Sequence, residues 1–455
     1  MIELTYSGGS ILIRGYEGEL PPDIAIFDNR IMCYRALGMN YEKVAEYLKS
    51  KGKEFTDNVC NCPDIEVKAN IKLRPYQSDA LDKWASSNMR GTIVLPTAAG
   101  KTHIGIEAIN RTKKKTIILV PTIDLLTQWK QKIKELLNLD AGQIGGGEKE
   151  EREITVSTYD SAYLMAEKYG NHFDLIIADE VHHLASEKLR MIAMMYTARY
   201  RLGLTATYER TDGLEKDLEY LMGGKIFELG YEEIDEYLAD YKIVRIPVEL
   251  DDDEQTQYEK YHSIFVNYLR KHRMAIGGSW DFNKFIRSSW TPEGREALTA
   301  WRKSREIAMN PAGKIEMART LVAQHKNERI IIFSEDTETT YRISKEFLIP
   351  AITYMTSKDE RSEIPELFKT GKYNVIATSR VLDEGVDFPD ASVAIVMSGS
   401  GSTRQFRQRL GRILRPSYGK KAVMYELVTS QTAEFGASRR RRKGVPSRTT
   451  SSEKD

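Results

Sequence analysis

The chain has 455 residues, of which 41% are hydrophobic and 29% charged, a balance typical of globular domains rather than of disordered chains. Lys and Arg number 67 and Asp and Glu number 66, so the overall charge favours no polyanionic partner, and contact with nucleic acid would need local basic surfaces. No apolar run approaches the about 20 residues of a membrane span, and the N-terminus lacks a signal-peptide pattern, so the sequence predicts a cytoplasmic protein without a membrane partner.

Three cysteines, Cys33, Cys60 and Cys62, form an odd and sparse set. Such a set is typical of a reducing compartment and argues against a disulfide framework. Cys60 and Cys62 could supply half of a metal site, but no second Cys or His pair lies near them in the sequence. The sequence therefore favours inert thiols.

Residues 1–68 are predicted to form a small α+β domain. Ile2–Tyr6 and Ile11–Ile13 are short apolar segments on either side of the turn Ser7–Ser10, a pattern typical of a β-hairpin. Tyr41–Ser50 has the spacing of an amphipathic helix that ends just before a glycine. This stretch shows no residue pattern typical of catalysis.

Two series of short apolar runs alternate with helical patterns, one in residues 69–240 and one in residues 311–432. This alternation predicts two tandem α/β lobes, each built on a parallel sheet that helices cover on both faces. The predicted strands are 92–95, 116–120, 154–157, 174–178 and 200–204 in the first lobe, and 329–333, 351–354, 374–378, 392–397 and 421–427 in the second.

Residues 241–310, between the lobes, are dense in charged and aromatic side chains at helical spacing, which predicts a helical insertion. Two interpretations of its aromatic residues stay open: they form a small core of their own, or they contact nucleic acid. Residues 433–455 contain the basic run Ser438–Lys443 among Ser, Thr and Gly, and we expect a disordered basic tail there.

A phosphate-binding loop is predicted at Pro96–Thr102, directly after the first strand of the first lobe. The backbone amides of Ala99 and Gly100 would face a triphosphate where the loop enters a helix. Lys101 would bring a positive charge to the β- and γ-phosphates, and the hydroxyl of Thr102 would be a ligand for Mg²⁺.

The loop departs from the strict G-x-x-x-x-G-K-T pattern, because Leu95 occupies the first glycine position and Ala98 replaces a glycine that is common in related loops. The Cβ atom of Ala98 restricts φ. We therefore expect the loop to reach its shape without a positive φ at Ala98.

An acidic pair ends a second apolar strand, in the sequence Asp179-Glu180-Val181-His182. Asp179 would hold Mg²⁺ directly or through water, and Glu180 would orient or deprotonate the attacking water. Because parallel strands place their carboxyl ends at one edge of the sheet, this pair and the phosphate loop supply two halves of an ATP·Mg²⁺ site.

Over residues 70–430, the order of the motifs resembles superfamily 2 helicases. The segments that carry the resemblance are Leu73–Gln77, Val120–Thr122, Val156–Tyr159, Leu204–Thr207, Ile331–Ser334, Val381–Asp387 and Gln408–Arg415. His182 in the acidic motif, the run Ser398–Ser402 and Gln408–Pro416 are most similar to the XPB (Rad25-type) helicases of DNA repair and transcription. This resemblance implies two RecA-like parallel-sheet lobes, a damage-recognition-like domain at 1–68 and a thumb-like insertion at 241–310.

The resemblance also implies roles for individual residues. Additional nucleotide contacts would come from Arg74, Gln77, Gly385, Asp387 and Gln408. Arg412 and Arg415 would be arginine fingers, with a basic helix face as the alternative interpretation. DNA contacts, or coupling between DNA and ATP, would come from Pro121, Thr122, Thr158, His182, Thr205, Thr207, Arg210 and Asp212.

One element differs from the family pattern. The Arg-Glu-Asp signature of the family stands here as Arg210-Thr211-Asp212, so a role that needs the central carboxylate is not expected of it. A turn closed by a salt bridge between Arg210 and Asp212 is an equally good interpretation of this element.

The implied function is an ATP-dependent 3′-to-5′ DNA helicase of nucleotide-excision-type repair, in which ATP hydrolysis couples lobe closure to strand movement. Two alternatives stay open: a duplex-DNA translocase that needs a partner, and an ATP-switched scaffold that binds damaged DNA. The implied cofactors are ATP and Mg²⁺. The implied partners are forked, single-stranded or damaged duplex DNA, with a repair nuclease or another repair or transcription factor.

Overall fold

The computed structural model describes residues 1–60, 62–210, 212–230, 232–234, 237, 240–276, 279–379, 391–399, 409 and 421–441. The chain divides into two compact units, residues 1–230 and 231–455. Among the described helices, none combines the length and the apolar character that crossing a membrane requires.

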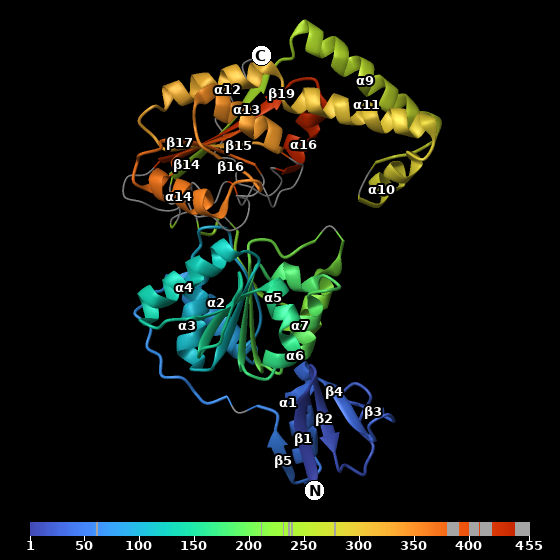
Figure 1. Ribbon diagram of the computed structural model, residues 1–455, viewed down its shortest axis with the longest axis vertical. Helices are drawn as coiled ribbons and strands as arrows, with labels where there is room; N and C mark the ends of the chain where they lie inside the picture. Colours follow the sequence, from blue (N-terminus) through green and yellow to red (C-terminus); the bar gives the residue numbers. More distant parts are fainter. Residues whose placement is uncertain are drawn as a thin grey trace. The chain divides into compact units, whose positions relative to one another are not determined.

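The first unit begins with a small domain built on a five-stranded sheet (Figure 1). Its predicted hairpin is confirmed, and Gly8 and Gly9 close it with positive φ angles. The predicted helix is also confirmed, and its apolar face is buried against the sheet. The elements are β1 (Ile2–Ser7), β2 (Ser10–Arg14), β3 (Ile26–Asp28), β4 (Cys33–Leu37), α1 (Tyr41–Ser50) and β5 (Phe55–Asn58).

An eight-stranded sheet forms the first lobe, in the order β13-β6-β12-β11-β7-β10-β8-β9. The described neighbours run parallel, with β8 and β9 as the antiparallel pair. The strands are β6 (Arg90–Val94), β7 (Thr116–Val120), β8 (Gly142–Gly145), β9 (Glu148–Glu150), β10 (Ile154–Thr158), β11 (Leu175–Asp179), β12 (Tyr200–Thr205) and β13 (Lys225–Glu228).

Helices cover both faces of this sheet, as predicted (Figure 1). One face carries α2 (Pro75–Ser86), α3 (Lys101–Thr112) and α4 (Ile123–Leu137), and the other carries α5 (Tyr159–Leu164), α6 (Ala166–Tyr169) and α7 (Arg190–Met195), with α8 (Asp217–Met222) beside them. The strands β7 and β11 are buried along their whole length, which accounts for their continuous apolar runs.

The N-terminal domain packs against the side of the first lobe that carries α6 and α7. The hydroxyl of Tyr6 donates a hydrogen bond to the carbonyl oxygen of Ala166 at 2.7 Å. The two backbones meet closely at Gly38, where a Cβ atom would overlap the carbonyl group of Met195. A side chain at position 38 would therefore push the small domain away from the lobe.

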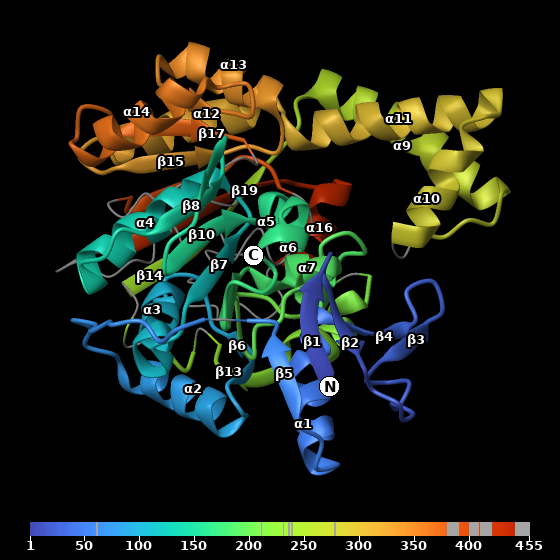
Figure 2. The same cartoon turned by 60° about the horizontal axis from the view of Figure 1, so that its bottom comes forward.

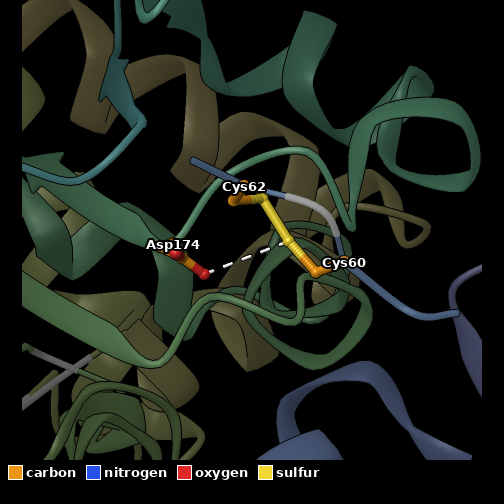
Figure 3. Close-up of side chains that lie close together, drawn as sticks. All are labelled: Cys60, Cys62 and Asp174. Carbon is orange, nitrogen blue, oxygen red and sulfur yellow. Dashed lines mark hydrogen bonds between the residues drawn. A yellow bond between two sulfur atoms is a disulfide. The ribbon is translucent and has the colours of Figure 1, made fainter. Parts of the chain in front are cut away.

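The connection between the small domain and the lobe corrects one prediction. Cys60 and Cys62 are joined by a disulfide bond and are not free thiols, whereas Cys33 is a buried free cysteine (Figure 3). The Cα atoms of the two cysteines are 5.7 Å apart, within the usual range for a disulfide. Asp174 lies beside the bridge, with Oδ1 4.0 Å from Sγ of Cys60, and burial raises the pKa of its carboxyl group.

The second unit contains a six-stranded parallel sheet in the order β14-β19-β18-β15-β17-β16. Its strands are β14 (Asp240–Val248), β15 (Ile330–Phe333), β16 (Ala351–Ile352), β17 (Val375–Thr378), β18 (Val393–Val396) and β19 (Lys421–Thr429), and its helices include α12 (Ala312–Gln324), α13 (Thr337–Phe347) and α14 (Lys358–Lys369). The five predicted strands are confirmed. The predicted boundary at 240/241 is wrong for β14, because all of its nine residues pair with β19.

The insertion between the lobes consists of α9 (Asp252–Lys271), α10 (Ser279–Ser288) and α11 (Pro292–Met309), with α9 and α11 side by side (Figures 1 and 2). Five of its aromatic residues form a core with Leu269, Ala297 and Leu298, namely Phe265, Tyr268, Phe282, Phe285 and Trp301. The core interpretation is therefore confirmed for these five. Trp290 is not part of this core, since 87% of its surface is exposed.

The predicted disordered tail is wrong for its first residues, because α16 (Ala433–Arg441) is a helix. Glu434 accepts a hydrogen bond from Nζ of Lys314 at 2.6 Å, and both side chains are buried. Ser438 donates to Glu426 at 2.9 Å. These buried contacts hold a segment whose Arg-rich composition alone indicated disorder, while residues 442–455 lie outside the described part of the chain.

Candidate functional site

The carboxyl ends of five neighbouring parallel strands, β6, β12, β11, β7 and β10, meet at one edge of the first sheet. The phosphate loop follows β6, and the acidic motif begins at the end of β11, two strands away. Predicted DNA contacts follow β7 and end β10, on the other side of β11. The edge therefore places the two halves of the nucleotide site on one side and the candidates Pro121, Thr122 and Thr158 on the other.

The phosphate loop leads into α3, which begins at Lys101. Gly100 precedes it with φ of +76°, and a Cβ atom there would lie 2.5 Å from Nε2 of Gln77. The ammonium group of Lys101 donates to the loop carbonyl oxygens of Leu95 at 3.1 Å and Pro96 at 3.3 Å. Phosphate oxygens would have to replace these carbonyls, and the helix N-terminus with Lys101 and Thr102 fits such a group.

The expectation for Ala98 is wrong. Its φ is +69°, in the left-handed region. For a residue with a Cβ atom this conformation costs about 1–2 kcal/mol. The loop thus takes the shape that a glycine would favour and tolerates the strain at an alanine, because the flanking residues are fixed by β6 and α3.

Gln77 and Tyr76, near the start of α2, hold the loop at Ala99, and Arg74 in turn bonds to Gln77. The side-chain oxygen of Gln77 accepts from the backbone N–H of Arg74 at 2.9 Å, and Nε2 of Gln77 donates to the carbonyl oxygen of Ala99 at 2.8 Å. The hydroxyl of Tyr76 donates to the same carbonyl at 2.8 Å. Tyr76 was not predicted as a site residue, since nothing in the sequence distinguishes it from a core aromatic.

Asp179 is buried at the end of β11. Its Oδ2 accepts a hydrogen bond from the indole N–H of Trp129 at 2.9 Å, and its Oδ1 accepts from the backbone N–H of Glu180 at 3.1 Å. Burial, followed by the negative charge of Glu180, raises the pKa of Asp179 from 3.8 to about 6. A cation beside this carboxylate would offset both effects, as expected of a metal ligand.

The hydrogen bond from Trp129 to Asp179 was not predicted from the sequence. It lies in α4 with Leu126, Ile133 and Leu137, at the spacing of an ordinary buried helix face. No sequence pattern marks its indole N–H as bonded to an acid 50 residues away.

Glu180 adopts a left-handed conformation with φ of +53°. Its Oε2 lies 3.1 Å from the hydroxyl of Thr205 and 3.5 Å from Nδ1 of His182. Nδ1 of His182 lies 3.2 Å from the same hydroxyl, which also accepts from the backbone N–H of Thr207 at 3.1 Å. The acidic motif and the Thr205–Thr207 motif thus form one hydrogen-bonded group.

Arg210 and Asp212 form the salt-bridged turn that was one of the two interpretations of this element. Nε and Nη2 of Arg210 donate to the two carboxylate oxygens of Asp212 at 2.8 and 2.6 Å. Nη1 of Arg210 donates to the carbonyl oxygen of His182 at 2.6 Å, so the turn is tied to the acidic motif. Thr211 lies outside the described residues.

Two of the DNA candidates, Thr122 and Thr158, are helix caps at strand ends. Thr122 accepts from the backbone N–H of Leu125 at the start of α4, and Thr158 accepts from the backbone N–H of Ser161 at the start of α5, both at 3.3 Å. Pro121 connects β7 to Thr122. Helix N-termini at a sheet edge suit contacts with phosphate groups.

The predicted residues of the second lobe, Gly385, Asp387, Gln408, Arg412 and Arg415, lie outside the described residues. Arg409 is described and is buried. It donates to the carbonyl oxygen of Ser398 at 3.2 Å and lies over the ring of Phe333. Arg409 is therefore not part of a solvated basic face.

Three family models match the chain. Residues 4–59 match the Xeroderma pigmentosum group B helicase damage recognition domain, residues 70–210 match the res subunit of type III restriction enzymes, and residues 295–445 match the ERCC3/RAD25/XPB C-terminal helicase. The three matched segments lie in the small domain, in the first lobe and in the part of the second unit from α11 onward, respectively.

Proteins with related sequences or folds are also found. The DNA 3'-5' translocase XPB2 of Sulfurisphaera tokodaii is 44% identical over 97% of this chain and all of its own length. The general transcription and DNA repair factor IIH helicase/translocase subunit XPB of Danio rerio is 28% identical over 90% of this chain, which spans 51% of that relative. The crystal structure of the Pyrococcus furiosus Hef helicase domain has a TM-score of 0.52 and 18% identity, covers 82% of this chain and 98% of its own, and shows a shared fold.

Proposed function

Because the chain belongs to the XPB (Rad25-type) family of superfamily 2 DNA helicases, we propose that it is an ATP-dependent DNA motor of 3′-to-5′ polarity that acts in DNA repair. The observation that carries the proposal is the shared sheet edge. The phosphate loop, the Asp179–Glu180 pair and the Thr205–Thr207 motif lie on three adjacent strands there, in direct hydrogen-bond contact from Glu180 to Thr205.

In this proposal the first lobe holds the nucleotide. Lys101 and the amides of Ala99 and Gly100 bind the β- and γ-phosphates, and Thr102 and Asp179 hold Mg²⁺. Bound Mg²⁺ would neutralise charge on the phosphate oxygens during hydrolysis. Glu180 orients the attacking water, and its contacts with Thr205 and His182 fix its side chain for that task.

The second lobe would complete the site with Arg412 and Arg415 as arginine fingers and with Gly385, Asp387 and Gln408 as further nucleotide contacts. A triphosphate that binds both lobes favours closure, and loss of the γ-phosphate removes that preference. If each lobe holds one DNA strand through its backbone, alternate binding moves the protein along it. Contacts at Pro121, Thr122 and Thr158 would be to phosphates and carry no sequence preference.

A duplex-DNA translocase is the second candidate, and one observation favours it. Both carboxylate oxygens of Asp212 are engaged by Arg210, and the central acid of the element is absent in Thr211. An element without a free acid is a weaker candidate for strand separation. In this case a repair nuclease or another repair or transcription factor would be the partner that makes opening possible.

The DNA substrate, the role of the N-terminal domain and the cellular location are proposed from the sequence. Forked, single-stranded or damaged duplex DNA is the proposed substrate, and the domain at residues 1–68 is proposed to bind the damage. A cytoplasmic location stays a prediction from the sequence.

The test is ATP hydrolysis by the full chain, measured without nucleic acid and then with single-stranded, duplex and forked DNA and with RNA. Lys101→Ala is the negative control, since it removes the cation that is proposed to bind the phosphates. Stimulation by DNA that the variant loses supports a DNA motor. Strand displacement on forked DNA then distinguishes a helicase from a translocase. A rate of ATP hydrolysis that DNA does not change would point to an ATP-switched scaffold instead.

A further inference from the structure

The indole of Trp129 makes a contact that neither core packing nor the proposed mechanism explains. Trp129 lies in the second turn of α4 and is 1% exposed. Its single donor, Nε1–H, is directed at Oδ2 of Asp179 at 2.9 Å. An indole N–H inside a protein needs an acceptor, and most side-chain hydrogen bonds are made to backbone groups or water rather than to other side chains.

Trp84 shows the ordinary solution in the same lobe. It is also fully buried, and its Nε1–H donates to the backbone carbonyl oxygen of Arg201 at 3.0 Å. The two tryptophans therefore match in burial and in hydrogen-bond length. They differ in the acceptor, which is a structural carbonyl for Trp84 and the proposed metal ligand for Trp129.

The ring of Trp129 has little freedom to move away from Asp179. Gly105 of α3 lies against it, and a Cβ atom at Gly105 would be 2.6 Å from Cη2 of the indole. The missing side chain at position 105 thus gives the ring its place between α3, α4 and the end of β11. Helix α3 begins with the phosphate loop, so the same packing connects both halves of the nucleotide site.

The two hydrogen bonds of Asp179 act on different oxygens. Glu180 donates to Oδ1 and Trp129 donates to Oδ2, so rotation of the carboxylate would break one or the other. A carboxylate fixed in this way presents its remaining lone pairs in one orientation. Groups that orient a metal ligand typically contribute 10–100-fold to metal affinity or activity.

We propose that Trp129 is the positioning residue of Asp179: its indole N–H orients the carboxylate for Mg²⁺, so that α4 sets the affinity of the nucleotide site for the metal. This inference rests on the proposed function, in which Asp179 is a Mg²⁺ ligand. Thr122, a proposed DNA contact, is the N-cap of α4, and Trp129 of the same helix bonds to the proposed metal ligand Asp179.

The test compares Trp129→Phe with Trp84→Phe in the full chain. Each variant keeps most of a buried ring and removes one indole N–H. Binding of a fluorescent ADP analogue is measured over a range of Mg²⁺ concentrations and in EDTA. For Trp129→Phe we expect the Mg²⁺ concentration for half-maximal binding to rise about 10–100-fold, with unchanged binding in EDTA. Trp84→Phe should keep the wild-type Mg²⁺ dependence.

A second variant covers the case that Trp129→Phe does not fold. Gly105→Ala keeps the indole but displaces the ring, and alanine favours the helix more than glycine does. It should raise the Mg²⁺ requirement in the same direction. Wild-type Mg²⁺ dependence in a folded Trp129→Phe, or in Gly105→Ala, overturns the inference. Absence of Mg²⁺-dependent binding in the wild type, or binding that Lys101→Ala leaves intact, overturns the proposed function as well.

Discussion

Two residues of the nucleotide site, Ala98 and Glu180, hold φ angles of +69° and +53°. Such conformations are costly for residues with a Cβ atom and persist only where neighbouring structure enforces them. Ala98 lies between β6 and α3, and Glu180 lies between β11 and the turn that holds His182. Both residues thus lie where their motifs leave the sheet.

For Ala98→Gly, we expect a net increase in the free energy of unfolding. Relief of the left-handed conformation gains about 1–2 kcal/mol, and the greater entropy of the unfolded glycine costs about 0.4–1 kcal/mol. Equilibrium urea unfolding should show a gain of about 0.5–1 kcal/mol. Ala99→Gly is the control, because Ala99 is buried without a positive φ and should lose stability. Equal losses in both variants would contradict the strain at Ala98.

The raised pKa of Asp179 predicts a pH dependence of metal binding. Below about pH 6 the carboxyl group is protonated and cannot serve as a Mg²⁺ ligand. The Mg²⁺-dependent part of nucleotide binding should therefore decrease as the pH falls through 6, with a titration in the range of pH 5–8 as the measurement.

The raised pKa of Asp179 affects protein stability in the opposite direction: stability decreases, rather than increases, as the pH rises. Because the folded pKa is raised above the unfolded value of 3.8, the contribution of Asp179 to stability is fully present below 3.8 and is lost as the pH rises through about 6. Without Mg²⁺, Asp179→Asn should thus remove a destabilising charge at pH 7.

The Mg²⁺ titration would contradict the raised pKa if the metal affinity were constant from pH 5 to 8. That result would show that Asp179 is already ionised throughout this range.

At the scale of elements, the second unit depends on a buried ion pair between α12 and α16. Lys314 and Glu434 are 0% and 2% exposed, and their charged atoms are 2.6 Å apart. Lys314 also donates to the carbonyl oxygens of Met309 and Met397, and Glu434 accepts from the backbone N–H of Thr429. These bonds join the end of α11, the end of β18 and the end of β19 at one point.

Lys314→Met should destabilise the protein by about 3–5 kcal/mol, because it leaves the carboxylate of Glu434 buried without its cation. Thermal or urea unfolding is the measurement. The control is Arg319→Met in the same helix, whose ion pair with Glu346 is 53% and 32% exposed and should contribute less than about 1 kcal/mol. A small loss in both variants would mean that α16 is not held by this pair.

At the scale of the whole molecule, the proposed mechanism requires groups from both units at one nucleotide. Arg412→Ala and Arg415→Ala should leave ATP binding largely unchanged and lower turnover by about 10³–10⁵-fold, as loss of an arginine finger does elsewhere. Binding of a fluorescent nucleotide and DNA-stimulated hydrolysis are measured on the same preparation. Normal turnover in both variants would contradict a site shared by the two lobes.

The sheets and their order along the chain could be predicted because fully buried parallel strands leave continuous apolar runs, as in β7 and β11. Strand β14 could not be predicted, because its sequence alone does not show that it pairs with β19, about 180 residues further along the chain. The helix α16 was missed for a similar reason: its stability comes from Lys314 and Glu426, which lie far from it in the chain.

The sequence by itself determined the class of fold, the family and the strand-end positions of the proposed site residues, because local spacing and strand order are written along the chain. Tertiary structure decided the remaining features: the left-handed φ of Ala98, the disulfide of Cys60 with Cys62, the turn of Arg210 with Asp212, and the bond from Trp129 to Asp179. Each depends on the surroundings that packing gives a residue, and on the room left for its backbone, which local sequence patterns do not encode.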